Sequence, residues 1–152
     1  MDSFRERGFV GDDTLEWVAE PGLLHLCGYI SCLGGIVIDV RKTLSVQSLD
    51  DDPQVQTEYY AYQAWVRGHH GILRYDSTHP HDGHLDEHHV HYFDWRTDEQ
   101  TALRWVGAAE WPTLGQVIEE VERWYWESRD TLPAPDSYGS LVDLRRRASS
   151  GE

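Results

Sequence analysis

Apolar and polar side chains alternate along much of the first 94 residues, with the period of two that is typical of β-strands. Two apolar runs, 23–33 and 36–40, meet at Gly34-Gly35. A Gly-Gly pair between such runs predicts a hairpin turn, because glycine readily adopts the positive φ angles that tight turns need. The segment before them, 14–19, is expected to form a short helix.

The stretch 55–66 is rich in tyrosine and also alternates with a period of two, so we expect a strand there. Glycines within 68–71 then turn the chain into a short strand at 71–76, which is expected to pair back as a hairpin. A polar loop leads to a last strand near 88–94. One side of the 55–66 strand is formed by Tyr60, Tyr62, Ala64 and Val66, and the other by Tyr59, Ala61, Gln63 and Trp65.

One segment in the second half of the chain has the spacing of an α-helix. It opens near Pro112, where the missing amide proton of proline costs nothing. Several strands followed by one helix predict an α+β fold, with an antiparallel sheet of about five strands and one main C-terminal helix packed on one face. The apolar stripe of this helix consists of Leu114, Val117, Ile118, Val121, Trp124 and Tyr125.

The chain has 152 residues, a length typical of one domain. We expect a flexible N-terminal arm over 1–12, a single α+β domain over 13–128, and a mobile C-terminal tail over 129–152 that is rich in Pro, Ser and Gly. No stretch approaches the about 18–20 apolar residues of a membrane span. The N-terminal residues also lack an apolar signal segment, so these features predict a cytoplasmic protein with no membrane partner.

The chain is strongly acidic, with 13 basic and 27 acidic residues and a formal net charge of −14. Lys42 is its single lysine, and the other basic residues are arginines. This balance excludes a basic nucleic-acid footprint at the level of the whole chain, so RNA would be repelled unless a local basic patch or a basic partner reverses the charge. Two explanations of the acidity stay open: adaptation to high salt, and association with a basic partner.

Histidines gather in one part of the chain, and three explanations stay open: a solvated polar loop, a metal site, or acid–base chemistry without a metal. Imidazole is a common metal ligand. Because residues i and i+2 of a strand share a face, His89 and His91 would form half a metal site. Asp76 or His79 would complete it. Eight of the nine histidines lie in this region: His69, His70, His79, His81, His84, His88, His89 and His91.

Histidine also suits proton transfer, because its ordinary pKa of about 6.5 lets one imidazole accept a proton while another donates one. Cleavage of RNA requires a base for the 2′-hydroxyl, an acid for the leaving 5′ oxygen and a cation for the phosphate. Arg74 offers a planar fork for two phosphate oxygens. Alternation places Arg74 and Asp76 on one sheet face and Tyr75 on the other. A structural ion pair between Arg74 and Asp76 is the alternative.

A set of motifs spread over about 22–127 resembles the TumE family of small toxin–antitoxin proteins. The resemblance implies a toxin encoded beside an antitoxin with a DNA-binding segment. It also implies an activity in RNA cleavage or the inhibition of translation. The motifs that carry it are Gly28-Tyr29-Ile30, Gly34-Gly35-Ile36, Val40-x-Lys42, Val55-Gln56-Thr57, Tyr59 to Tyr62, Arg74-Tyr75-Asp76, His79, His88-His89-x-His91, Trp111-Pro112-Thr113-Leu114 and Glu119-Glu120-Val121.

We therefore expect a site on one sheet face, where the strand at 71–76 meets the strand near 88–94. The predicted function is a toxin that acts on RNA as a metal-independent ribonuclease, with no cofactor and with a cognate antitoxin as partner. The alternatives are a non-enzymatic module that binds or regulates a partner, and a histidine-rich hydrolase that needs a divalent metal. The expected roles are His89 and His91 as the acid–base pair, Arg74 and Lys42 as cations for phosphate, Asp76 as the orienting carboxylate, and His79 as the next candidate.

Overall fold

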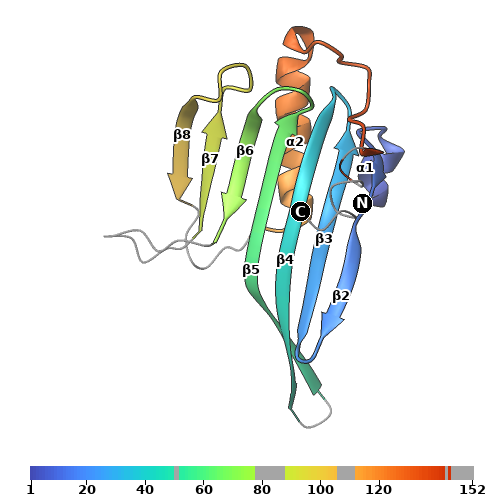
Figure 1. The fold of residues 1–152 in the computed structure, drawn as a ribbon, viewed down its shortest axis with the longest axis vertical. Coiled ribbons are helices and arrows are strands. Elements are labelled where there is room, and N and C mark those ends of the chain that lie inside the picture. The colour runs from blue at the N-terminus through green and yellow to red at the C-terminus, as the bar shows by residue number, and fades with distance from the viewer. Residues whose placement is uncertain (50–51, 78–87, 106–111, 143, 145–152) are drawn as a thin grey trace.

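Eight strands of the computed structural model form one antiparallel sheet, and helix α2 covers one of its faces (Figure 1). This arrangement confirms the α+β class and the single main C-terminal helix. The described residues are 1–49, 52–77, 88–105, 112–142 and 144. Their elements are α1 (Asp2–Glu6), β1 (Val10–Asp13), β2 (Glu16–Glu20), β3 (Leu23–Cys32), β4 (Ile36–Leu49), β5 (Asp52–Val66), β6 (Gly71–Asp76), β7 (His89–Phe93), β8 (Gln100–Trp105), α2 (Leu114–Ser128) and a 3₁₀ turn at Arg129–Thr131.

The strands follow one another across the sheet in the order β1-β3-β4-β5-β6-β7-β8, and β2 pairs with the same edge of the sheet by bonding to β3. Every pairing is antiparallel. Strands β4 and β5 are the longest, and their paired ends project beyond the part of the sheet that α2 covers (Figure 1). Neighbouring strands are therefore mostly hairpin partners, as the turns in the sequence predict.

The expected number of about five strands is too low, because β1, β2 and β8 were not predicted. The helix expected at 14–19 is wrong, since Glu16–Glu20 forms strand β2. All five residues of β2 are exposed, so no alternation of buried and exposed positions marks it in the sequence. Its conformation comes from hydrogen bonding to β3, a case in which tertiary pairing overrides local preference.

The hairpin predicted at Gly34-Gly35 is confirmed between β3 and β4. The φ angles of these glycines are 76° and 69°, the left-handed conformation that glycine adopts readily, and three residues separate the paired residues Cys32 and Ile36. The turn also lies against the helix layer, because a Cβ atom added at Gly34 would come within 2.9 Å of the Tyr125 ring. Glycine at this position therefore serves both the turn and the packing of α2.

Helix α2 begins with a capping box, in which the Thr113 side chain accepts from the backbone of Gln116 while the Gln116 side chain accepts from the backbone of Thr113. The predicted apolar stripe faces the sheet. Leu114 and Trp124 are only partly buried at its edges. The helix residues that are fully buried in the core are Val117, Ile118, Val121 and Tyr125.

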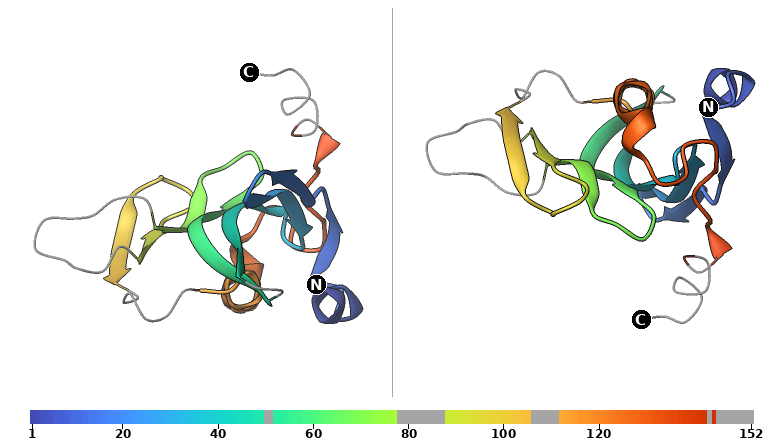
Figure 2. Two further views of the ribbon diagram at one scale, coloured as in Figure 1. Left: turned by 90° about the horizontal axis from the view of Figure 1, so that it is seen from below. Right: turned by 90° about the horizontal axis from the view of Figure 1, so that it is seen from above.

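Both terminal segments contribute side chains to the core, so the packed part of the chain extends beyond 13–128. Near the N-terminus, the buried side chains are Phe4, Phe9 and Val10. Beyond α2 the chain crosses to the other face of the sheet (Figure 2), where Leu141 and Leu144 pack with Val37. Among the described residues, neither helix combines the length and the apolar character that crossing a lipid bilayer would require.

Candidate functional site

Two rows of side chains, most of them polar, cross the sheet face that points away from α2. Residues that lie directly opposite each other on antiparallel strands share a face, with Cβ atoms about 4.5–5.5 Å apart. The pairing register therefore determines which residues meet from β4 to β8. The first row is Asp39, Gln63, Arg74, His91 and Leu103, and the second is Arg41, Ala61, Asp76, His89 and Trp105.

Asp76 is the centre of the strongest cluster on this face. One of its carboxylate oxygens, Oδ2, lies 3.3 Å from Nε of Arg74, and the other, Oδ1, lies 3.3 Å from Nε2 of His89. The ring of His89 meets that of His91 edge to face, with centroids 4.7 Å apart. The Asp76 carboxylate is almost completely buried. It therefore holds a guanidinium and an imidazole in fixed positions.

The two histidines of this cluster differ in their exposure to solvent. His89 is 1 % exposed and also contacts the indole of Trp105. His91 is half-buried, and its Nδ1 lies 2.9 Å from Oε1 of Gln100. Because an amide oxygen only accepts hydrogen bonds, Nδ1 of His91 is the donor there. In the neutral ring, Nε2 of His91 then carries the lone pair that can accept a proton.

The structure brings together four of the six residues predicted for the site: Arg74, Asp76, His89 and His91. Lys42 does not join them, because it pairs with Tyr60 and so lies on the α2 face of the sheet. His79 lies outside the described residues. The geometric expectation that strands 71–76 and 88–94 would join these four side chains on one face is confirmed, whereas their chemical roles stay predictions.

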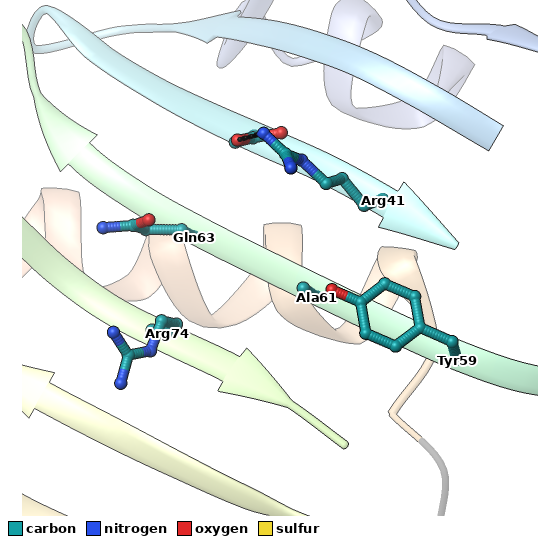
Figure 3. A pocket seen from close by; sticks show the side chains of 6 residues that line it. Arg41, Tyr59, Ala61, Gln63 and Arg74 are labelled. Carbon is teal, nitrogen blue, oxygen red and sulfur yellow. Dashed lines mark hydrogen bonds and ion pairs between the residues drawn. The ribbon is translucent and has the colours of Figure 1, made fainter. Parts of the chain in front are cut away.

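A shallow pocket of about 220 Å³ lies beside the cluster, on the same face of the sheet. Figure 3 shows its side chains rising from three neighbouring strands, β4, β5 and β6, with α2 behind the sheet. The sequence analysis missed this pocket, although the alternation in β5 had placed Tyr59, Ala61 and Gln63 on one side. The residues that line the pocket are Asp39, Arg41, Tyr59, Ala61, Gln63 and Arg74.

Two opposite charges share the β4 side of this pocket. The guanidinium of Arg41 lies 3.4 Å from the carboxylate of Asp39. Burial raises the pKa of Asp39 above its ordinary value, and the positive charge of Arg41 only partly opposes this shift. A carboxylate that has lost part of its hydration gains more from a hydrogen-bond donor than a fully solvated one does.

A separate polar network on the α2 face anchors the strand that carries Arg74 and Asp76. The hydroxyl groups of Tyr75 and Tyr92 both donate to the carboxylate of Glu120 on α2. Arg104 of β8 donates to both of these hydroxyl groups. Burial is the main cause of the raised pKa of Tyr75 and of Tyr92. The network therefore fixes β6, β7 and β8 to the helix with neutral phenols.

The Asp76 cluster also has the composition of a metal site. Asp76, His89 and His91 each offer one ligand atom, and these atoms lie within 4.8 Å of one another. Two imidazoles and one carboxylate are a donor set that divalent transition metals accept. The residues therefore fit either a metal or a proton-transfer site.

Comparison with known proteins gives one clear finding. A family model described as Toxin TumE matches residues 24–128, which include every residue of the two rows. No curated protein and no solved structure matches the chain significantly.

Proposed function

The chain belongs to the TumE family of toxins, which are components of toxin–antitoxin systems, and on this premise we propose that it acts on RNA as a metal-independent ribonuclease. Its partner in this proposal is a cognate antitoxin that carries a DNA-binding segment. The observation that carries the proposal is the half-exposed imidazole of His91, which lies opposite Arg74 on the sheet face that points away from α2. A base beside a cation is the arrangement that attack on a phosphodiester requires.

The proposed reaction is the transfer of a phosphodiester to the neighbouring 2′-oxygen. Nε2 of His91 takes the proton of the 2′-hydroxyl, and the 2′-oxygen forms a bond to phosphorus. The bond from phosphorus to the 5′ oxygen breaks, and this oxygen takes the proton back from the imidazolium of His91 through water. The guanidinium of Arg74 stabilises the negative charge that develops on the phosphate. The products are a 2′,3′-cyclic phosphate and a free 5′-hydroxyl.

His89 and Asp76 act through His91 and Arg74 in this proposal. The expectation that His89 would exchange protons with RNA fits poorly with its burial, because a side chain that is 1 % exposed has little access to substrate. Asp76 holds His89 on one side and Arg74 on the other, each at 3.3 Å. We therefore assign positioning roles to Asp76 and His89, and the transfer of the proton to His91.

The test is cleavage of a fluorescently labelled RNA oligonucleotide by the purified protein in the presence of EDTA. We expect a cyclic phosphate product, and no product from the same oligonucleotide with 2′-deoxyribose at every position. His91→Ala should lower the rate by about 10²–10⁴-fold, the usual contribution of a general base. His69→Ala is the matched control, because His69 is an exposed imidazole outside the cluster and should leave the rate unchanged.

Both variants should unfold in urea at the same midpoint as the unaltered protein, since neither side chain is fully buried. Cleavage that persists in His91→Ala would refute the role of His91. Toxicity in cells that survives the same substitution would favour the non-enzymatic binding module instead.

A metal-dependent hydrolase is the second candidate, because the ligand atoms of Asp76, His89 and His91 lie within 4.8 Å of one another. EDTA separates the two candidates. Activity that is lost in EDTA and restored by Zn²⁺ or Mn²⁺ would replace the metal-independent proposal. Activity that is unchanged by EDTA would leave proton transfer by His91 as the explanation.

A further inference from the structure

The pocket beside the Asp76 cluster has the chemistry of a nucleotide site. We propose that it binds one nucleotide of a single-stranded RNA, with the base against the ring of Tyr59 and a phosphate between Arg41 and Arg74. This inference rests on the proposed action on RNA, and names the part of the substrate that the sheet face recognises. It involves residues of β4 and β5 that the proposed reaction does not use.

The pocket exists because a small residue lies at its floor. Along this face of β5 the side chains are Tyr59, Ala61, Gln63 and Trp65, so Ala61 is the one small residue among large ones. Its cross-strand neighbours are Arg41 on β4 and Asp76 on β6. The volume of the pocket, about 220 Å³, is smaller than the roughly 300–1,000 Å³ of pockets for drug-sized ligands. A single nucleotide held partly in solvent suits such a space.

Two arginines approach the pocket from the strands on either side of β5. Arg41 and Arg74 are two strands and two residues apart, because Arg41 is aligned with Ala61 and Asp76 and Arg74 with Gln63. With about 4.7–4.9 Å between strands and about 3.4 Å per residue, their backbones are separated by about 12 Å. Both side chains line the same pocket. The side chains of Arg41 and Arg74 are 63 % and 43 % exposed. Each guanidinium has five N–H donors, so it can keep its carboxylate partner and still bind a phosphate oxygen.

The remaining side chains suit a nucleobase. Single-stranded RNA is commonly recognised by stacking of unpaired bases on aromatic rings and by hydrogen bonds to their edges. Tyr59 supplies a half-exposed ring at one end of the pocket, and Gln63 supplies an amide that both donates and accepts. The partly desolvated carboxylate of Asp39 adds an acceptor for base N–H groups.

The pocket is also in the right place to deliver a phosphate to His91. Arg74 lines the pocket and lies directly opposite His91 in the pairing of β6 with β7. If the phosphate of a nucleotide lies between Arg41 and Arg74, it is therefore one strand away from His91, the proposed general base.

The test is isothermal titration of the intact protein with the four ribonucleoside 3′-monophosphates, with ribose 5-phosphate as the probe that lacks a base. We expect at least one nucleotide to bind more tightly than ribose 5-phosphate by about tenfold, the scale of one stacked base. Tyr59→Leu should remove this difference, whereas Tyr59→Phe should retain it because the aromatic ring remains. Ala61→Leu, which fills the floor of the pocket, should weaken binding of the nucleotide by at least tenfold.

The sequence offers a matched control for the charge. Arg41→Gln and Lys42→Gln each remove one positive charge from adjacent positions of β4, but the two side chains lie on opposite faces of the sheet. We expect Arg41→Gln to weaken nucleotide binding by at least tenfold and Lys42→Gln to change it by less than twofold. Equal weakening by the two variants would overturn the proposal, because it would indicate attraction to overall charge. Failure of all four nucleotides to bind better than ribose 5-phosphate would also overturn it.

Different results would refute the nucleotide pocket and the ribonuclease reaction. Nucleotide binding that depends on Tyr59 and Arg41, in a protein that cleaves no RNA, would sustain the pocket and refute the ribonuclease. Cleavage that depends on His91 but is unaffected by Tyr59→Leu and Arg41→Gln would refute the pocket and sustain the ribonuclease. The urea midpoint of each variant shows that loss of binding is not loss of folding.

Discussion

Removal of the chain after Ser128 should destabilise the protein severely, even though the sequence beyond this residue has no regular pattern. The truncation deletes three leucines that are buried against the sheet, Leu132, Leu141 and Leu144. Burial of one leucine side chain contributes about 1.5–3 kcal/mol, so the three together contribute roughly 4–9 kcal/mol. The free energy of unfolding of an ordinary domain is about 5–15 kcal/mol. We therefore expect the truncated chain to be partly or largely unfolded at 25 °C.

The measurement is urea unfolding followed by tryptophan fluorescence and far-ultraviolet circular dichroism. A chain that ends at Leu144 is the matched control, because it lacks only 145–152 and should retain the free energy of unfolding of the full chain within about 1 kcal/mol. A second variant tests the same contact without shortening the chain. In Gly139→Ala, the added Cβ would lie 2.7 Å from the backbone oxygen of Ile36, so the docked segment must shift. A chain ending at Ser128 that is as stable as the full chain would refute the packing argument.

Two further predictions follow from burial. Tyr125→Ala should lower the free energy of unfolding by about 3–5 kcal/mol in urea titrations, because Tyr125 is buried. Trp126→Ala replaces a side chain that is 60 % exposed and should change it by about 0.5 kcal/mol or less. Similar effects of the two substitutions would contradict the orientation of α2. Burial raises the pKa of Tyr62 to about 12, so the unfolded state loses this proton first. Titration of Tyr62 should therefore lower the free energy of unfolding by about 2 kcal/mol as the pH rises from 10 to 12. Tyr62→Phe should remove this part of the pH dependence in urea titrations, at no cost in hydrogen bonding among the described residues.

The sequence predicts which side chains share the site face, the sheet face that points away from α2, wherever a strict period of two holds along a strand. Arg74 and Asp76 are two residues apart on β6, and His89 and His91 are two residues apart on β7, so each pair had to share a face. The register of β6 with β7, in which Arg74 pairs with His91 and Asp76 with His89, then brings the four side chains together; a shift of one residue would have put the two pairs on opposite faces. What the sequence did not reveal is that His89 would be covered, because burial depends on neighbours such as Trp105 from the unpredicted strand β8.

The prediction that Lys42 belongs to the site was wrong, and the sequence of β4 already indicated that Lys42 lies on the other face. Ile36, Ile38 and Val40 alternate on the buried face of β4, and Lys42 continues their parity. The cation that reaches the site face is the neighbour with the opposite parity, Arg41. The motif Val40-x-Lys42 carries the resemblance to the family and makes Lys42 the candidate cation. The alternation along β4 instead indicates Arg41 as the cation on the face of the Asp76 cluster.

The edge strands and the terminal contacts were not predictable for a common physical reason. Strand β8 is mostly exposed and β2 is wholly so, and a strand held by backbone hydrogen bonds needs no alternation of side chains. Beyond α2, Leu132 and Leu141 are separated by two prolines and a glycine, so they show no period although each one is buried. Hydrophobic pattern therefore predicts the centre of this sheet and gives little information about its margins.

The helix and the opposite face of the sheet carry different charges, and this difference makes the acidic composition of the chain compatible with the RNA substrate that we propose. Exposed glutamates such as Glu119 and Glu127 lie on α2, whereas on the opposite face of the sheet Arg41 and Arg74 balance Asp39 and Asp76. A helix is about 10–12 Å in diameter, and exposed charges beyond about 8 Å are largely screened at physiological ionic strength. A phosphate on the site face therefore interacts mainly with the two arginines and their partners. The net charge of −14 repels RNA at a distance but does not determine what happens once a strand lies on this face.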